Sequence, residues 1–389
     1  MTVAKEKNNL RLTDGLAILL FLTCIVLPSS GQENDSRDLK ISLLFMGDIM
    51  GHDEQIWSAE DRQTSTYSFD TVFKYIRPVI SDSDLAFANF EVTLAGPPYK
   101  GYPRFTSPSA LASACKNAGI DCLVTANNHA ADHGISGLKG TVMRLDSIGI
   151  AHTGTFTDQI SRNSQYPLIL KKNGFSIALL NYTYGTNGIK VPPPFIVNML
   201  DKSLITGDIL KAKKSNPDIM VLFLHWGTEY DTIPSGLQVQ LADYFFSLGI
   251  DLIIGSHPHV IQKMIWSKRD SLHKDRVVAY SLGNFLSNQR KPKTDGGYMV
   301  RVEFTKNDKS VFISNTGYYL TWVYTPIVDY RKKFFILPCS AFENNPQFFK
   351  NHADFIRMKE FIDGSRTLLH MQNTNFRENI FSGYGWILN

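Results

Sequence analysis

Short apolar runs recur along the chain, most of them ending at a glycine or a polar residue, and amphipathic segments separate them. Continuous apolar runs are typical of strands that are buried on both faces. They predict strands at residues 41–46, 85–90, 121–125, 219–224, 252–254 and 277–281. Amphipathic spacing predicts helices at residues 109–118, 135–148, 204–214 and 237–248. This alternation predicts an α/β fold.

Two pairs of apolar runs have the spacing of β-hairpins. Residues 166–170 and 175–181 flank an Asn-Gly pair, which is a strong turn signal between apolar runs. Residues 298–304 and 311–313 are separated by a short polar turn. Hairpins among alternating units predict a mixed sheet, or two sheets packed together, with helices outside. We expect residues 331–389, where the pattern changes, to form a mostly helical C-terminal appendage.

The first 31 residues have the organisation of a secretory signal peptide. Basic residues precede an apolar run at residues 16–27, and small residues follow it. The pattern predicts cleavage after Gly31 and export to the periplasm or cell envelope. The run is shorter than the about 20 residues of a membrane span, so the mature protein would be peripheral to the membrane at most. An uncleaved signal anchor and a lipoprotein attached through Cys24 are the alternatives.

Composition narrows the range of partners. The 389 residues carry a formal net charge of +4, and the basic residues are scattered along the chain. We therefore expect no nucleic-acid partner. Three cysteines follow the predicted signal peptide, so at least one thiol is free. We expect Cys115 and Cys122 to be buried free thiols.

Six separated segments end in residue types that bind metal ions, and four of them follow an apolar run. Glu91 ends one such run, where a buried carboxylate is costly unless a cation or donor partners it. In His257-Pro258-His259 the two imidazoles are two residues apart, so an extended backbone would turn both to one side. Carboxylate, imidazole and amide oxygen together suit a pair of Mn, Fe or Zn ions. The candidate ligands are Asp48, Glu91, Asn128, His225, His257 and His259.

His129 is a candidate for acid–base catalysis, because the adjacent Asn128 can serve as the ligand and leave the imidazole free. Asp132 lies three residues later and could orient the imidazole through its second nitrogen. Capping is the alternative: Asp48 could cap the helix that follows its strand, and Asn128-His129 could cap the helix before Gly149. The candidate substrate-binding residues are His52, Asn89 and Asn284.

The ordered set of motifs resembles the CapA family, which is associated with poly-γ-glutamate capsule synthesis and is similar to the calcineurin-like metallophosphoesterases. The motifs are Gly-Asp-Ile-Met, Asn-Phe-Glu, Ala-Asn-Asn-His-Ala-Ala-Asp-His-Gly, His-Trp-Gly-Thr-Glu-Tyr, Gly-Ser-His-Pro-His and Ser-Leu-Gly-Asn-Phe. The likeness covers residues 39–304. It implies a metallophosphoesterase-like domain at residues 39–330, built as a four-layer sandwich of two mixed sheets flanked by helices.

The resemblance also implies how the ligands divide between two metals. Asp48 and His259 match ligands of a first metal, and Glu91 takes the place of an aspartate that bridges the two metals. The chain departs from the phosphoesterase pattern at Met50, where a ligand histidine is expected, and in having glutamate at position 91. The first metal could therefore recruit His52.

Asn128, His225 and His257 match ligands of the second metal, and His129 matches the proton donor. These features together predict an exported metal-dependent hydrolase of the CapA type that acts on an anionic polymer or a phosphoester at the cell envelope, with a capsule-synthesis complex as a candidate partner. The alternatives are a non-catalytic accessory protein that binds poly-γ-glutamate or another anionic polymer for export, and a pseudo-enzyme with a structural role.

Overall fold

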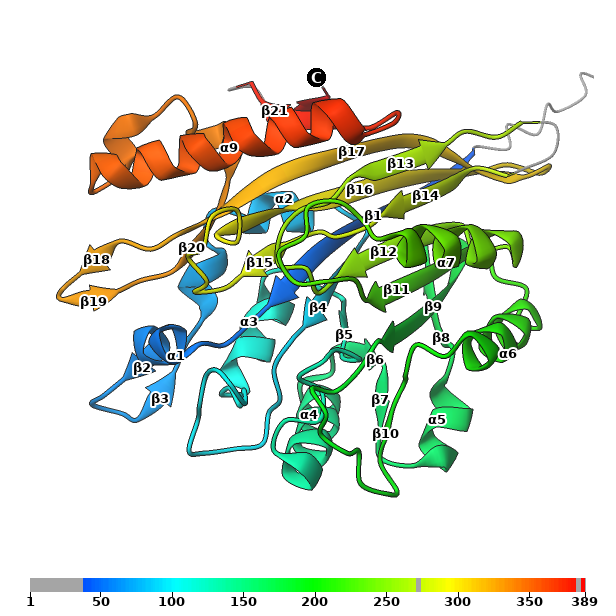
Figure 1. Ribbon diagram of the computed structural model, residues 1–389, viewed down its shortest axis with the longest axis horizontal. Coiled ribbons are helices and arrows are strands. Elements are labelled where there is room, and N and C mark those ends of the chain that lie inside the picture. Colours follow the sequence, from blue (N-terminus) through cyan, green and yellow to red (C-terminus); the bar gives the residue numbers. More distant parts are fainter. Residues whose placement is uncertain (1–37, 271–273, 383–385, 389) are drawn as a thin grey trace, which may run out of the picture. The chain divides into compact units, whose positions relative to one another are not determined.

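The computed structural model describes residues 38–270, 274–382 and 386–388 (Figure 1). The predicted signal peptide and Cys24 lie outside the described residues. Among the helices that are described, none combines the length and the hydropathy that crossing a bilayer requires.

The larger sheet has ten strands in the order β22-β21-β17-β16-β1-β4-β5-β6, with β15 beside β1 and β20 beside β17. Strands β1, β4, β5 and β6 are parallel to one another, whereas β16 and β17 are antiparallel, so the sheet is mixed. Its strands are β1 (Leu39–Ile49), β4 (Leu85–Phe90), β5 (Cys122–Val124), β6 (Ala151–Thr153), β15 (Asn284–Leu286), β16 (Gly296–Lys306), β17 (Val311–Tyr324), β20 (Phe335–Pro338), β21 (Arg377–Phe381) and β22 (Trp386–Leu388).

The smaller sheet has six strands in the order β13-β14-β12-β11-β9-β8. They are β8 (Leu168–Lys172), β9 (Phe175–Thr183), β11 (Ile219–His225), β12 (Leu252–Ser256), β13 (Met264–Ser267) and β14 (Arg276–Ala279). The predicted hairpin joins β8 and β9. Its turn residues Asn173 and Gly174 have φ of 49° and 77°, the left-handed conformation that an Asn-Gly hairpin turn requires.

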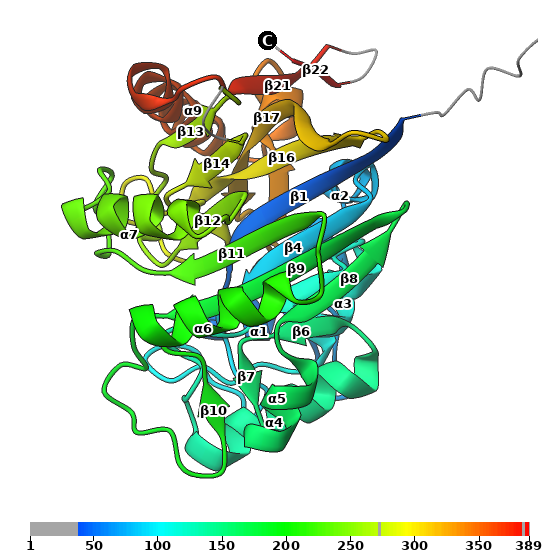
Figure 2. The same ribbon diagram turned by 90° about the vertical axis from the view of Figure 1, so that its right-hand side faces the viewer.

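Three hydrophobic clusters separate four layers of structure. Alternate side chains of β1, including Leu43 and Phe45, join those of β9, β11 and β12 in a core between the two sheets. On the outer face of the larger sheet, Leu44 and Met46 pack against α2 (Arg77–Ser81) and α3 (Ala110–Asn117). The outer face of the smaller sheet is covered by two helices, α6 (Lys202–Lys213) and α7 (Gly236–Ser247), as Figure 2 shows. The predicted four-layer sandwich of mixed sheets is therefore confirmed.

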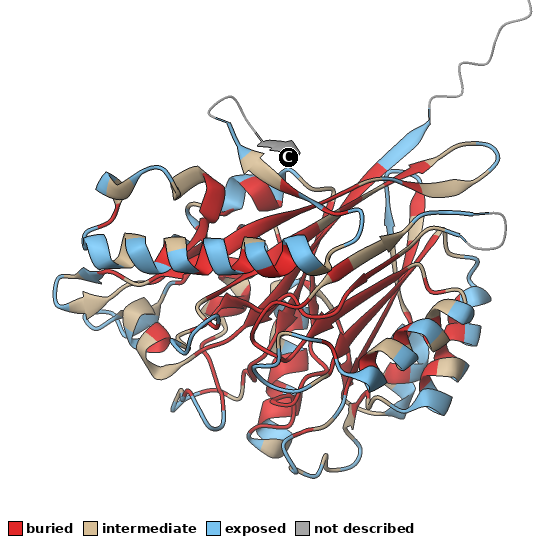
Figure 3. Ribbon diagram, turned by 45° about the horizontal axis from the view of Figure 1, so that its top comes forward, coloured by how far each residue is buried: buried red, intermediate tan, exposed pale blue. Residues whose placement is uncertain are grey.

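The C-terminal segment joins the larger sheet. Strand β20 pairs with β17 in antiparallel orientation and β21 pairs with it in parallel orientation. The helix α9 (His352–Gln372) buries Met358, Phe361 and Ile362 in the inter-sheet core, and Figure 3 shows its buried and exposed faces. Arg366 of α9 binds both Glu343 and Glu378, which holds the helix to the segments on either side.

Shorter elements complete the fold. They are α1 (Asp53–Ala59), β2 (Glu60–Asp61), β3 (Thr66–Tyr67), η1 (Asp70–Phe73), α4 (Gly134–Ile148), β7 (Thr155–Phe156), α5 (Gln159–Gln165), β10 (Ile196–Val197), β18 (Ile327–Val328), β19 (Arg331–Lys332), α8 (Cys339–Phe342) and η2 (Pro346–Phe348). Cys115 and Cys122 are buried free thiols, as predicted, and Cys339 is a third.

Candidate metal centre

Metal-binding side chains from both sheets meet at the carboxyl ends of their strands. Asp48 is the next-to-last residue of β1, Glu91 follows β4, and His225 ends β11. All three side chains are fully buried. Each offers a ligand atom, and these atoms lie within 4.8 Å of one another. The carboxyl ends of strands in an α/β sheet are where ligands usually bind, so this cluster is the candidate site.

Glu91 lies at the centre of the cluster. Its Oε1 is 3.9 Å from His225 Nε2 and 3.9 Å from His259 Nε2. This oxygen is buried and has no hydrogen-bond partner among the described residues. Two ligands that bind one ion at about 2.1 Å can be at most about 4.2 Å apart, so both separations are compatible with ions on either side of Oε1. The unpaired oxygen therefore fits a bridging ligand.

Asp48 and His259 form one half of the site. His259 Nδ1 lies 3.2 Å from Asp48 Oδ2 and 3.1 Å from Asn284 Oδ1. Asn89 donates its amide N–H to Asp48 Oδ1 at 2.7 Å and lies 3.3 Å from Glu91 Oε2. Asn89 and Asn284, predicted as substrate-binding residues, thus contact the candidate ligands directly and hold them in place.

His225, Asn128 and His257 form the other half. Asn128 Oδ1 lies 2.9 Å from His225 Nε2, and the rings of His225 and His257 are 4.8 Å apart. Ser256 Oγ is 2.9 Å from His225 Nδ1 and can accept a hydrogen bond from its N–H, which leaves the Nε2 lone pair for a metal. His257 Nδ1 is buried without a partner among the described residues. All six predicted ligands therefore lie in one cluster.

The segment His257-Pro258-His259 does not have the extended backbone that the sequence suggested. His257 has φ of 101° and His259 has φ of 58°, both in the left-handed region that residues other than glycine rarely occupy. The two rings reach the site through this turn, with their centroids 6.1 Å apart. The expectation that alternation along an extended chain brings them together was wrong. Strained backbone of this kind is concentrated at functional sites.

The electrostatics of the site favour a bound cation. Burial, followed by the neighbouring charge of Asp48, raises the pKa of Glu91 well above its usual value. Burial and the neighbouring His257 lower the pKa of His225 well below its usual value, and burial lowers the pKa of His257 to about 3. The imidazoles of His225 and His257 are therefore neutral and can donate lone pairs. Carboxylate and amide oxygens and imidazole nitrogens, gathered around a buried oxygen that has no partner among the described residues, fit divalent metal ions.

His129 and Asp132 form a buried pair beside the ligands. His129 Nδ1 is 2.8 Å from Asp132 Oδ2, which also accepts the Phe105 backbone N–H at 2.7 Å. The Phe105 ring packs edge-on against the imidazole at 4.7 Å. These contacts orient His129 and leave its Nε2 without a hydrogen-bond partner in the described parts of the chain. Nε2 is therefore the nitrogen that could transfer a proton.

Neither capping alternative is observed. The residue at the N-cap of α1 is His52, four residues beyond Asp48. The residue at the N-cap of α4 is His133, so Asn128 and His129 do not cap that helix.

Met50 and His52 lie near the site but outside the group of ligand atoms. Met50 is buried, and its sulfur accepts a hydrogen bond from Ser287 Oγ at 3.6 Å. His52 Nδ1 is 2.9 Å from Gln55 Oε1, and its ring packs against Phe105 at 5.2 Å. Burial lowers the pKa of His52 to about 4. His52 is thus held by Gln55 of its own helix turn and by the backbone N–H of Asn288, which lies 3.3 Å from the same ring nitrogen.

Three residues at the site were not predicted from the sequence. The Tyr184 ring lies 4.5 Å from His257 and the Tyr230 ring lies 6.2 Å from His259, and both tyrosines are exposed. Asn127 donates to the carbonyl of Phe90 at 2.8 Å and ties the end of β4 to the following loop. The position of Tyr184, directly after β9, was the available signal.

Comparison with known proteins identifies relatives of the chain. Residues 42–289 match the model of the family described as bacterial capsule synthesis protein PGA_cap. Capsule biosynthesis protein CapA of Bacillus anthracis is 29% identical over 74% of this chain and 68% of its own length. PGA biosynthesis protein CapA of Bacillus subtilis is 29% identical over 70% of each chain. Among solved structures, the calcineurin-like phosphoesterase YfkN of Bacillus subtilis is similar, with 14% identity, a TM-score of 0.45, and coverage of 73% of this chain and 90% of its own.

Proposed function

Because the chain belongs to the bacterial capsule synthesis protein family PGA_cap, we propose that it is an exported metal-dependent hydrolase acting on an anionic polymer or a phosphoester in capsule metabolism. The proposal rests on the buried Oε1 of Glu91, which lies between His225 and His259 and has no hydrogen-bond partner in the described part of the chain. A carboxylate in that position is stabilised by a cation and costly without one. Family membership supports the assignment to capsule metabolism, and the candidate metal ligands support metal-dependent hydrolysis.

Each part of the site has a role in this reaction. A pair of divalent ions would supply Lewis acidity and neutralise negative charge on the substrate. Asp48, Glu91 and the three histidines would hold those ions. His129 would give a proton from Nε2 to the leaving group, because Asp132 holds its Nδ1. The exposed rings of Tyr184 and Tyr230 would contact the substrate at the entrance.

Metal content and turnover test the proposal together. Protein purified with Mn, Fe or Zn should carry about two ions per chain by elemental analysis. It should then hydrolyse at least one of a phosphomonoester, a phosphodiester and a γ-glutamyl peptide. The His225→Ala variant should lose bound metal and activity while staying folded, since the domain has its own large core. Wild-type protein that binds no metal would contradict the proposal.

One observation favours a second function. Met50 stands where the phosphoesterase pattern has a ligand histidine, and its sulfur is engaged by Ser287. A first metal bound by fewer ligands would be held less tightly. The second candidate is therefore an accessory protein that binds an anionic polymer for export without cleaving it. Metal binding without turnover on any of the three substrate classes would favour this function.

Export is the remaining part of the proposal. Mass spectrometry of the native protein should find an N-terminus at or near Gln32. An intact terminus at Met1 or Thr2 would contradict cleavage.

A further inference from the structure

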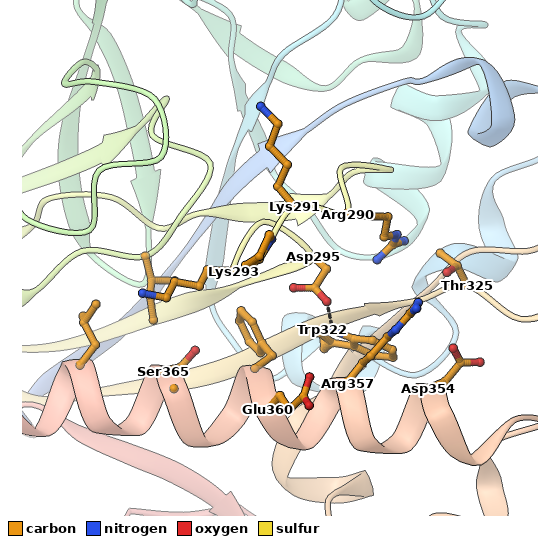
Figure 4. A pocket seen from close by; sticks show the side chains of 15 residues that line it. Arg290, Lys291, Lys293, Asp295, Trp322, Thr325, Asp354, Arg357, Glu360 and Ser365 are labelled. Carbon is orange, nitrogen blue, oxygen red and sulfur yellow. Dashed lines mark hydrogen bonds between the residues drawn. The ribbon is translucent and has the colours of Figure 1, made fainter.

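The pocket between the segment after β15 and the helix α9 compensates its own charges (Figure 4). Arg290 and Arg357 share it with Asp295 and Asp354, and both carboxylates attract the charge of Arg290. Trp322, which also lines this pocket, is buried. Among its described lining residues the pocket therefore offers a ligand little net charge and no exposed aromatic ring.

A second pocket, of about 230 Å³, differs because it exposes aromatic rings. It lies between α1 and the hairpin of β18 and β19, which Figure 1 shows at the left edge of the molecule, and we call it the hairpin pocket. Trp57 of α1 is 58% exposed, and Tyr330 of the hairpin is fully exposed. The other lining residues are Glu54, Ser58, Arg62, Arg331 and Lys332. Large apolar side chains that are exposed side by side in a pocket are typical of binding sites.

The backbone of Tyr330 is strained for a residue of its size. The hairpin turns through Asp329 and Tyr330, whose φ values are 51° and 59°. Two-residue turns of this kind favour Asn-Gly or Asp-Gly, because glycine adopts a positive φ without steric cost. A tyrosine is an outlier there, and its exposed ring gains no packing energy within the protein in return. An outlier of this kind favours a function for the ring.

The charges around the hairpin pocket compensate one another. Each of the three cations in the lining has a carboxylate beside it. The pairs are Arg62 with Glu60 at 3.8 Å, Lys332 with Glu54 at 3.8 Å, and Arg331 with Asp61. Neither an anion nor a cation therefore gains a strong net attraction, whereas the same side chains can donate and accept hydrogen bonds.

A pyranose ring matches this combination of aromatic rings and compensated polar groups. Its hydroxyls both donate and accept hydrogen bonds, and its C–H faces are apolar and can pack against aromatic side chains. In a β-1,4-linked ring of the glucose type the substituents are equatorial, so both faces stay free for such contacts. The pocket is smaller than the roughly 300–1,000 Å³ that is usual for drug-sized ligands, so it fits one ring of a chain.

The hairpin pocket lies beside the metal centre. Lys332 donates to Asn288 Oδ1 at 3.2 Å, and the backbone N–H of Asn288 lies 3.3 Å from His52 Nδ1. The His52 ring packs against Phe105, whose ring also contacts His129. A glycan held in the pocket is therefore a close neighbour of the candidate catalytic residues.

We propose that the hairpin pocket binds one ring of a neutral, β-1,4-linked glycan of the glucose type, with Trp57 and Tyr330 packed against the ring. The inference goes beyond the proposed function, because this second site needs neither a metal ion nor hydrolysis. It would hold the protein on a glycan while the metal centre acts on a different molecule.

Isothermal titration with the β-1,4-linked tetrasaccharide of N-acetylglucosamine tests the proposal. Tyr330→Gly should weaken binding roughly 10- to 30-fold, because aromatic rings are among the residues whose loss costs a binding site most. Glycine suits the left-handed turn, so the same variant should keep or raise the Tm of the protein. Asp329→Gly is the matched control, because it relieves the same turn but lies outside the pocket lining. It should bind the tetrasaccharide within about twofold of the wild type.

Trp57 provides a second measurement. Its exposed indole should change its fluorescence emission when the tetrasaccharide binds. Trp57→Ala should lose both that change and most of the affinity. Alanine is the best helix former, so α1 should persist, and circular dichroism checks this.

Three outcomes would overturn the proposal. They are wild-type protein that does not bind the tetrasaccharide, equal losses from Tyr330→Gly and Asp329→Gly, and adenosine monophosphate that binds more tightly than the tetrasaccharide with the same dependence on Tyr330. His225→Ala tests the metal centre apart from the pocket, since it should lose metal yet bind the tetrasaccharide as the wild type does. Loss of that binding would place the glycan at the metal centre and also overturn the proposal. Wild-type protein that binds the tetrasaccharide in this way but carries no metal supports the hairpin pocket and contradicts the hydrolase function.

Discussion

Replacing Glu91 by glutamine should abolish most of the thermal stabilisation that metal ions give this protein. The substitution keeps the shape of the side chain but removes its charge and one of its two acceptor oxygens. A bound ion at 100 times its dissociation constant stabilises the folded state by about 2.7 kcal/mol. For about 350 folded residues, an unfolding entropy of about 2.1 cal/mol/K per residue converts this to a rise in Tm of about 4 °C per ion.

The loss can be estimated in the same way. Glu91 Oε1 lies 3.9 Å from a ring nitrogen of both His225 and His259, so its removal should weaken metal binding at least about 100-fold. At the same metal concentration the stabilisation then falls to about 0.4 kcal/mol, or less than 1 °C. Differential scanning fluorimetry with Mn, Fe and Zn, each against a chelator control, measures this difference.

Asp251→Asn is the matched control. Asp251 precedes β12, at the opposite end of the strand from His257, and accepts the Met220 backbone N–H at 2.8 Å. It undergoes the same change from carboxylate to amide, and the metal-induced rise in Tm should persist in full. A Glu91→Gln variant that keeps the wild-type rise would refute the assignment of Glu91 as a ligand.

Three further predictions follow from buried polar groups. His129→Ala should keep its metal and lose about 10²- to 10⁴-fold in kcat on a poor leaving group, with a smaller loss for Asp132→Asn; retained turnover would exclude a proton-transfer role. Asp208→Ala should cost about 3–5 kcal/mol in urea unfolding, because it leaves the buried Arg162 without its ion partner. Burial raises the pKa of Asp251 from 3.8 to about 6. The stability that this residue contributes is therefore present below pH 3.8 and lost as the pH rises through about 6. Asp251→Asn should remove up to about 3 kcal/mol of the pH dependence of the unfolding free energy.

The sandwich could be predicted because its strands are buried on both faces. In such strands nearly every position is apolar, and the run 85–90 coincides with β4 for that reason. The long strand β17 was harder to identify. The polar run Ser314, Asn315 and Thr316 interrupts its apolar residues, and its length depends on pairing with β16 and β20. The extent of such pairing is set by the packing of the whole sheet and leaves little signal in the residues of a single strand.

The ligands of the candidate site could be named from residue type and position, but their arrangement could not. The sequence suggested that His257 and His259 lie on one side of an extended segment, whereas both have left-handed backbone. That conformation is strained for histidine and persists only because the surrounding structure imposes it. Likewise, nothing near Tyr230 in the sequence indicates that Lys291 covers its ring, because sixty residues separate them along the chain.

The candidate ligands also show why metal binding should be linked to the stability of the whole sandwich. Asp48 and Glu91 lie at the carboxyl ends of strands of the larger sheet, whereas His225 and His259 lie at the carboxyl ends of strands of the smaller sheet. The two sheets are otherwise joined mainly by apolar side chains, which do not specify the separation of individual polar atoms. An ion bound by ligands from both sheets adds directional bonds across that interface. Because such a site exists only when both sheets are packed, its binding free energy becomes part of the folding free energy.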